Sequence, residues 1–254
     1  MAVLRDDFLP PQLEPLLKQN RFSGSVVIQS AQNEEENVFQ LNNAINNSFV
    51  KGIVGWVDFQ GKNCMDVLDN FAVIEKIKGF RHILQGAQDR ASMLSPTFKN
   101  GIRLLQRYGY TYDLLVQPDQ LGFAETLVRE FPDQPFVLNH LGKPDIKRGN
   151  LKDWEKKIRA LAEHEQVYCK VSGLVTEADL FAWKESDFRP FLDVVFEAFG
   201  INRVMFGSDW PVCLLAANYE TVISIVEKYT MTFSADEYNK FWGENANRFY
   251  KLKL

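Results

Sequence analysis

The 254-residue chain is 46% hydrophobic and 24% charged, with a formal net charge of −4, a composition typical of a globular protein with a large core. Its Lys and Arg residues form no basic block, so we expect no nucleic-acid partner. Three cysteines without a CxxC spacing, an N-terminus without an apolar signal region and no run of about 18 apolar residues predict a cytoplasmic protein without a disulfide framework, a secretory signal or a membrane span.

Short apolar or β-branched runs alternate with longer segments of helical periodicity along the chain. Leu104, Leu105 and Tyr108 illustrate the spacing of three and four residues that marks one face of a helix. A helix over 10–22 precedes the first strand. The predicted strands are 24–30, 50–59, 77–85, 111–117, 135–142, 167–174 and 203–209. The other predicted helices are 33–47, 65–77, 95–109, 118–131, 151–164, 187–200, 218–231 and 234–252.

This alternation predicts parallel β/α units, and the absence of a long Gly/Ser/Pro-rich linker predicts one domain over residues 1–254. A TIM-like (β/α)8 barrel takes about 250 residues but needs eight strands. Only seven strands are recognisable here. The sequence therefore predicts either an open α/β sheet or a distorted barrel whose first strand is missing.

In parallel β/α folds the reactive groups lie at the carboxyl ends of the strands. Asp209 is the most informative of them, because a carboxylate at the end of the apolar run "RVMFGSD" needs a charge, a metal or hydrogen-bond donors. The polar or aromatic residues at or near the predicted strand ends are Gln29, Trp56, Asp58, Arg81, His82, His140, Lys170, Ser172 and Asp209.

Several of these residues also have a purely structural explanation. His82 could be a hydrogen-bonded core residue, Trp56 a core aromatic, and Lys170 could extend to the barrel rim. Arg81 and His82 are adjacent, so only one of them is expected to point into the barrel. Two of the three histidines nevertheless fall on predicted strands, which favours a functional cluster.

Four motifs together resemble a known family. "GFRHILQ", "LNHLGKP", "CKVSGL" and "FGSDWPVC", followed by "ENANRFYKL", are similar to the amidohydrolase-related family (amidohydrolase 2) over essentially the whole chain. Within it they look most like the lactonase branch that includes L-fuconolactonase, L-rhamnono-lactonase and 2-pyrone-4,6-dicarboxylate lactonase. The resemblance implies a distorted (β/α)8 barrel that hydrolyses, or closes, a lactone ring.

The resemblance also implies roles for individual residues. Asp209 matches the general base that takes a proton from water, and His140 matches a histidine that contacts substrate or metal. Arg81 and His82 match substrate-contacting positions. This chemistry is coherent by itself, because ester hydrolysis needs an activated water and positive or donor groups facing the developing oxyanion.

Four further residues complete the predicted substrate-binding set. Lys170 and Trp210 fall near the same mouth of the barrel. Trp56 and Trp210 are candidates to line the faces of a sugar, and Gln29 ends the first predicted strand.

The chain departs from the family pattern at its beginning. The family starts with a short strand carrying His-x-His, and this chain contains no His-x-His. Hydrolytic zinc sites usually have three protein ligands, so we expect no required cofactor and at most a weakly bound divalent cation such as zinc. We also expect a gap with two strand edges and an apolar seam. A mis-assigned start, a truncated paralogue and a substitute strand elsewhere would each explain the absence.

The predicted function is a cytoplasmic hydrolase that opens the lactone of a sugar acid or related acid with base-activated water. The alternatives are a metal-dependent decarboxylase or amidohydrolase of the same superfamily, and a non-catalytic barrel. The expected partner is a small-molecule lactone or sugar acid, with no nucleic acid and no membrane. The sequence is compatible with a monomer or a homo-oligomer.

Overall fold

The computed structural model describes residues 2–253 and contains one sheet of seven parallel strands. The strands follow one another around the sheet in chain order, as the β/α alternation predicted. Each prediction of a strand is confirmed, with shorter bounds. The strands are β1 (Ser25–Ile28), β2 (Val50–Gly55), β3 (Ile77–Ile83), β4 (Thr111–Leu115), β5 (Phe136–Leu138), β6 (Val167–Val171) and β7 (Val204–Phe206).

Helices connect the strands and begin at recognisable signals. The side chains of Asn33 and Ser95 accept hydrogen bonds from the first turns of α2 and α4, and Gly109 ends α4 in the left-handed conformation. None of the helices in residues 2–253 has the length and apolar character needed to cross a bilayer. The α-helices are α1 (Pro10–Gln19), α2 (Glu34–Asn46), α3 (Cys64–Ala72), α4 (Pro96–Tyr108), α5 (Leu121–Glu130), α6 (Lys152–Ala162), α7 (Glu185–Phe199), α8 (Tyr219–Thr230), α9 (Ala235–Asn239) and α10 (Asn245–Tyr250).

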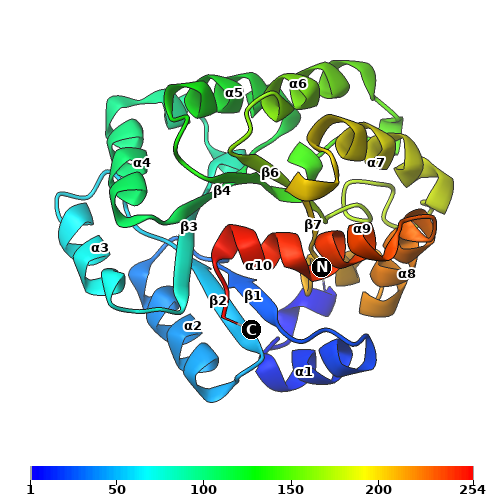
Figure 1. The fold of residues 1–254 in the computed structure, drawn as a ribbon, viewed down its shortest axis with the longest axis horizontal. Helices are drawn as coiled ribbons and strands as arrows, with labels where there is room; N and C mark the ends of the chain where they lie inside the picture. Colours follow the sequence, from blue (N-terminus) through cyan, green and yellow to red (C-terminus); the bar gives the residue numbers. More distant parts are fainter. Residues whose placement is uncertain (1, 254) are drawn as a thin grey trace.

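The sheet curls into a barrel-like wall with helices α2 to α7 around its outside and α10 across its centre (Figure 1). Outward residues such as Leu138 and Cys169 belong to the main core beneath the helices. Inward residues such as Val137 and Met205 instead pack against Phe249 of α10 and the adjoining Tyr250. Because α10 meets the first residues of β3 and β4, it closes the amino-terminal end of the barrel. The opposite end remains for the functional site.

The two edge strands, β1 and β7, do not pair with each other in the described part of the chain. Aromatic side chains pack on the β7 edge. Phe22, which follows α1, stacks on Phe206 of β7 with ring centroids 5.7 Å apart, and Trp242 lies 4.6 Å from Phe206. The β7 side of the expected apolar seam is therefore covered by aromatic packing without an eighth strand, whereas the residues of β1 stay partly exposed.

Asn245 of α10 protects the β7 edge more directly. Its side-chain amide donates to the carbonyl oxygens of Ile201 and Val204, both at 2.7 Å, and the residue is fully buried. Buried carbonyl groups need such partners. The side chain thus supplies a hydrogen bond that a neighbouring strand would otherwise make.

Candidate active site

His140 and Asp209 meet at the carboxyl end of the barrel. His140 lies two residues beyond β5, and Asp209 lies three residues beyond β7. The Nε2 atom of His140 is 3.7 Å from Oδ1 of Asp209, and the side chains are only 16% and 13% exposed. The pair predicted to be catalytic is thus brought together in a nearly buried position.

The backbone at this pair is strained. His140 and Asp209 have φ values of 53° and 55°, a left-handed conformation that residues other than glycine rarely adopt. Gly173 faces His140 so closely that an added Cβ would lie 2.9 Å from the His140 Cβ. Such strain persists where the surrounding structure fixes it and is concentrated at functional sites.

The end of β6 holds both side chains in place. Ser172 Oγ lies 2.8 Å from Nδ1 of His140, and Thr176 Oγ1 donates to Oδ2 of Asp209 at 3.3 Å. The free nitrogen of the imidazole and the other carboxylate oxygen therefore face one another. Ends of three consecutive strands form the site.

Burial sets the protonation of the two groups. Loss of solvent raises the pKa of Asp209 to about 6, against the smaller opposing effects of the Lys143 charge and the Thr176 hydrogen bond. Burial also lowers the pKa of His140 well below its usual value, and the charges of Lys143, Arg81 and Lys170 act in the same direction. Near neutral pH the site thus holds a carboxylate and a neutral imidazole.

Below this pair, a polar layer crosses the barrel interior. Arg81 donates through Nη2 to the backbone oxygen of Gln29 and to its side-chain oxygen at 3.2 Å, while Gln29 Nε2 donates to the Arg81 carbonyl at 3.0 Å. Lys170 forms an ion pair with Asp113 of β4. Arg81, Gln29 and Lys170, all predicted from the sequence, therefore belong to the interior of the barrel.

His82 and Trp56 lie in different surroundings. The centroid of the His82 ring lies 4.3 Å from that of Phe59 and 5.4 Å from that of Phe98. Its Nδ1 atom lies 3.5 Å from the hydroxyl oxygen of Tyr112. Trp56 approaches this aromatic cluster, 5.8 Å from His82. Burial lowers the pKa of His82 to about 4. Adjacent strand residues point to opposite faces, so Arg81 occupies the interior and the structure does not bring His82 to Asp209.

Trp210 follows Asp209 directly, but its ring turns toward the N-terminal segment. It meets Phe8 edge-on at 5.4 Å and packs with the cluster that contains Leu17. Its predicted role as a wall for the substrate stays a prediction.

Four residues outside the predicted catalytic and substrate-binding set complete the site. Ser172 was recognised at the end of its strand but was given no role. Lys143 lies inside the motif "NHLGKP" and forms an ion pair with Glu177. Asp113 is a lone acid within the apolar run "TYDLLVQ", which is a signal of a buried ionic partner. Thr176 lies in a loop and carried no such signal.

The donor atoms do not form a complete metal site. Within residues 2–253, no three His, Cys, Asp or Glu side chains come together to hold a metal ion. His140 and Asp209 are two donors, whereas a hydrolytic zinc site usually has three protein ligands. The residues described here therefore do not fit a zinc centre by themselves.

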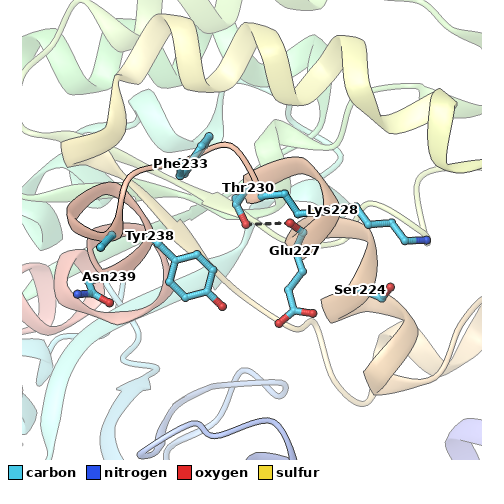
Figure 2. Close-up of a pocket in the computed structure, with 9 residues that line it drawn as sticks. Ser224, Glu227, Lys228, Thr230, Phe233, Tyr238 and Asn239 are labelled. Carbon is cyan, nitrogen blue, oxygen red and sulfur yellow. Dashed lines mark hydrogen bonds between the residues drawn. The ribbon is translucent and has the colours of Figure 1, made fainter.

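A groove of about 610 Å³ lies elsewhere. Figure 2 shows it between α8 and α9, where Glu227 and Tyr238 approach the same space and Thr230 donates to the Glu227 backbone oxygen. None of its lining residues belongs to the polar cluster around Asp209. This groove is therefore separate from the candidate active site.

Comparisons with known proteins agree with the barrel geometry. A family model described as Amidohydrolase matches residues 3–252. An L-fucono-1,5-lactonase from Burkholderia multivorans is 37% identical over 99% of this chain and 88% of its own length. An L-fucono-1,5-lactonase from Burkholderia ambifaria is 32% identical over 99% of this chain and 87% of its own length.

A solved structure extends this similarity to three dimensions. The crystal structure of an amidohydrolase from Burkholderia multivorans with bound zinc has a TM-score of 0.95 and 37% identity to this chain. The match covers 100% of this chain and 92% of that one. Sequence motifs, barrel topology and full-length similarity lead to one conclusion: this chain belongs to the amidohydrolase family.

Proposed function

We propose that this protein is a lactonase, a carboxylic ester hydrolase that opens the ring of a sugar-acid lactone. The single observation that carries the proposal is the nearly buried carboxylate of Asp209 beside His140 at the catalytic end of the barrel. The names of relatives over 30% identical support lactone hydrolysis and do not favour a decarboxylase. L-Fucono-1,5-lactone is the substrate to test first.

In this mechanism Asp209 is the general base. Its carboxylate takes a proton from water, and the water oxygen forms a bond to the lactone carbonyl carbon. The ring C–O bond then breaks, and the proton held by Asp209 passes to the leaving ring oxygen. A base whose pKa is about 6 is ionised at neutral pH and remains a competent proton acceptor.

His140 stabilises the oxyanion in the same scheme. When Ser172 donates its hydroxyl proton to Nδ1, the ring proton resides on Nε2 and can be donated to the substrate carbonyl oxygen. The charges of Arg81, Lys170 and Lys143 add a positive field around this position. Preorganised positive groups are the main means by which enzymes stabilise such an oxyanion.

We assign substrate hydroxyl or carboxyl groups to Arg81, Lys170 and Gln29 as proposed contacts. We propose a single-domain enzyme of carbohydrate metabolism in the cytoplasm, acting on a small molecule. His82 and Trp56 are proposed at most to support the rim of the site through their aromatic cluster.

We further propose that turnover needs no tightly bound metal, because within residues 2–253 only two donor side chains converge at the site. Activity should survive dialysis against a chelator. Loss of turnover that zinc restores would overturn this part of the proposal.

A pH-indicator assay over a panel of aldonolactones tests the function. We expect hydrolysis of L-fucono-1,5-lactone by the wild-type chain and a loss of roughly 1,000-fold in Asp209→Asn. The exposed Asp133→Asn variant is the matched control and should keep full activity. No turnover of any lactone, or near-full turnover by Asp209→Asn, would reject the proposal.

A further inference from the structure

A second buried carboxylate, Asp113, organises the floor of the barrel. Asp113 lies in the middle of β4 and is completely buried. Its two oxygens accept hydrogen bonds from the Tyr250 hydroxyl at 3.0 and 3.1 Å, and one also pairs with the Lys170 ammonium. A buried carboxylate is stable only with such partners. Three residues from distant parts of the chain are thereby joined.

Tyr250 reaches this carboxylate because α10 crosses the barrel (Figure 1). Its ring packs edge-on against Phe249 at a centroid distance of 4.8 Å and lies 5.4 Å from the Lys170 ammonium. Burial and the Asp113 charge raise the pKa of Tyr250 well above its usual value, so the hydroxyl keeps its proton. The C-terminal helix therefore supplies a permanent donor to Asp113.

Lys170 has hydrogen-bonding capacity that these contacts do not use. An ammonium has three N–H donors, and Asp113 is the hydrogen-bond partner of Lys170 found within residues 2–253. The side chain is only 10% exposed. Its charge acts on His140, as does that of Arg81, whose Nε is also buried without a partner in the described chain. Two cations thus act on the reaction site, and Asp113 is the carboxylate that pairs with Lys170.

We propose that Tyr250 and Asp113 are positioning residues that hold Lys170 so that its remaining N–H groups bind an oxygen of the lactone or of the acid it yields. This inference rests on the proposed function and extends it to the C-terminal helix. Asp113 fixes the direction of the ammonium, and Tyr250 fixes the direction of Asp113. An oxygen with negative or partial negative charge fits the unused N–H donors of Lys170.

Tyr250→Phe is the most direct test, because it removes one hydroxyl and keeps the ring that packs on Phe249. We expect kcat/KM for L-fucono-1,5-lactone to fall by roughly 10- to 100-fold, the loss typical of a hydrogen bond to a charged group. Tyr168→Phe is the matched control. Tyr168 packs in the same inner cluster through Phe249 and does not bond to Asp113, so its variant should retain wild-type kinetics.

A double-mutant cycle separates positioning from a general loss of structure. If Tyr250 acts through Lys170, adding Tyr250→Phe to Lys170→Met should cause no further loss in kcat/KM. Equal losses in both backgrounds would overturn the inference. Asp113→Asn provides a second variant, and it should weaken binding of the product aldonate in calorimetry as much as Lys170→Met does. Unchanged aldonate binding in the folded Asp113→Asn protein would also overturn it.

The two proposals fail differently. If Asp209→Asn abolishes turnover while Tyr250→Phe matches Tyr168→Phe, lactone hydrolysis by Asp209 stands and the positioning role is wrong. If the wild type hydrolyses no lactone yet Lys170→Met and Asp113→Asn both weaken aldonate binding, the floor contacts stand and the proposed reaction is wrong.

Discussion

The imidazole of His140 stands between Ser172 and Asp209, with Nδ1 2.8 Å from the serine Oγ and Nε2 3.7 Å from the aspartate Oδ1. The serine orients the ring from the end of β6, while the carboxylate approaches from beyond β7. Proton transfer and oxyanion stabilisation can therefore be served by neighbouring atoms.

The buried charge of Asp209 should reduce the stability of the fold. Its folded pKa of about 6 lies above the usual 3.8, so the folded state favours the protonated acid. The stabilising contribution of protonated Asp209 to the folded state is fully present below pH 3.8 and is lost as the pH rises through about 6. The difference between the folded and unfolded pKa values corresponds to about 3 kcal/mol in the free energy of unfolding. Asp209→Asn should therefore be more stable than wild type at pH 8, with little difference at pH 4, in denaturant unfolding.

Asp133→Asn serves as the control here too, and it should unfold like wild type at both pH values. A less stable Asp209→Asn at pH 8 would mean that neighbouring positive charges compensate for the burial of this carboxylate.

Turnover should depend on pH through the same group. Asp209 must be ionised to accept a proton, so kcat/KM should fall as pH decreases below about 6 and level off above it. Protonation of His140 should not lower kcat/KM near neutral pH, because burial holds the pKa of this imidazole well below 6.5. A pH profile of kcat/KM in constant ionic strength checks this. A midpoint of this pH profile near pH 4 would contradict the idea that burial raises the pKa of the general base.

Gly173 should be intolerant of a side chain. Its φ of 68° strains any other residue, and an added Cβ would press on the His140 Cβ. Gly173→Ala should lose about 1–3 kcal/mol of stability and at least tenfold in kcat/KM. Gly122, exposed in α5 with open space around it, is the control, and its alanine variant should gain up to about 1 kcal/mol. Equal behaviour of the two variants in unfolding and kinetics would refute the packing argument.

Asn245 should contribute to stability rather than to chemistry. Asn245→Ala removes two hydrogen bonds to the carbonyl groups of Ile201 and Val204 and leaves those groups buried. We expect a loss of roughly 2–4 kcal/mol in chemical unfolding. Asn70→Ala, on the exposed side of α3, should change stability little. KM should stay at its wild-type value in both folded variants, and a selective rise in KM for Asn245→Ala would point to a role in binding.

The sequence by itself determined the seven β/α units, their parallel order and the candidate pair His140 and Asp209. Apolar runs and helical periodicity follow from local chain geometry, and polar residues at strand ends stand out against an apolar background. It also limited Arg81 and His82 to opposite faces, because neighbouring side chains of a strand alternate.

Only the tertiary structure decided which of those two faces is the interior, since both sides of a parallel strand are covered and alternation alone does not distinguish them. It also decided how β7 is protected, through Phe22, Trp242 and Asn245 from distant segments. The hydrogen-bonded link from Tyr250 through Asp113 to Lys170 likewise joins segments that are distant in the sequence. Contacts between residues far apart in the chain arise when helices pack on a curved sheet, and no local pattern encodes which side chains then meet.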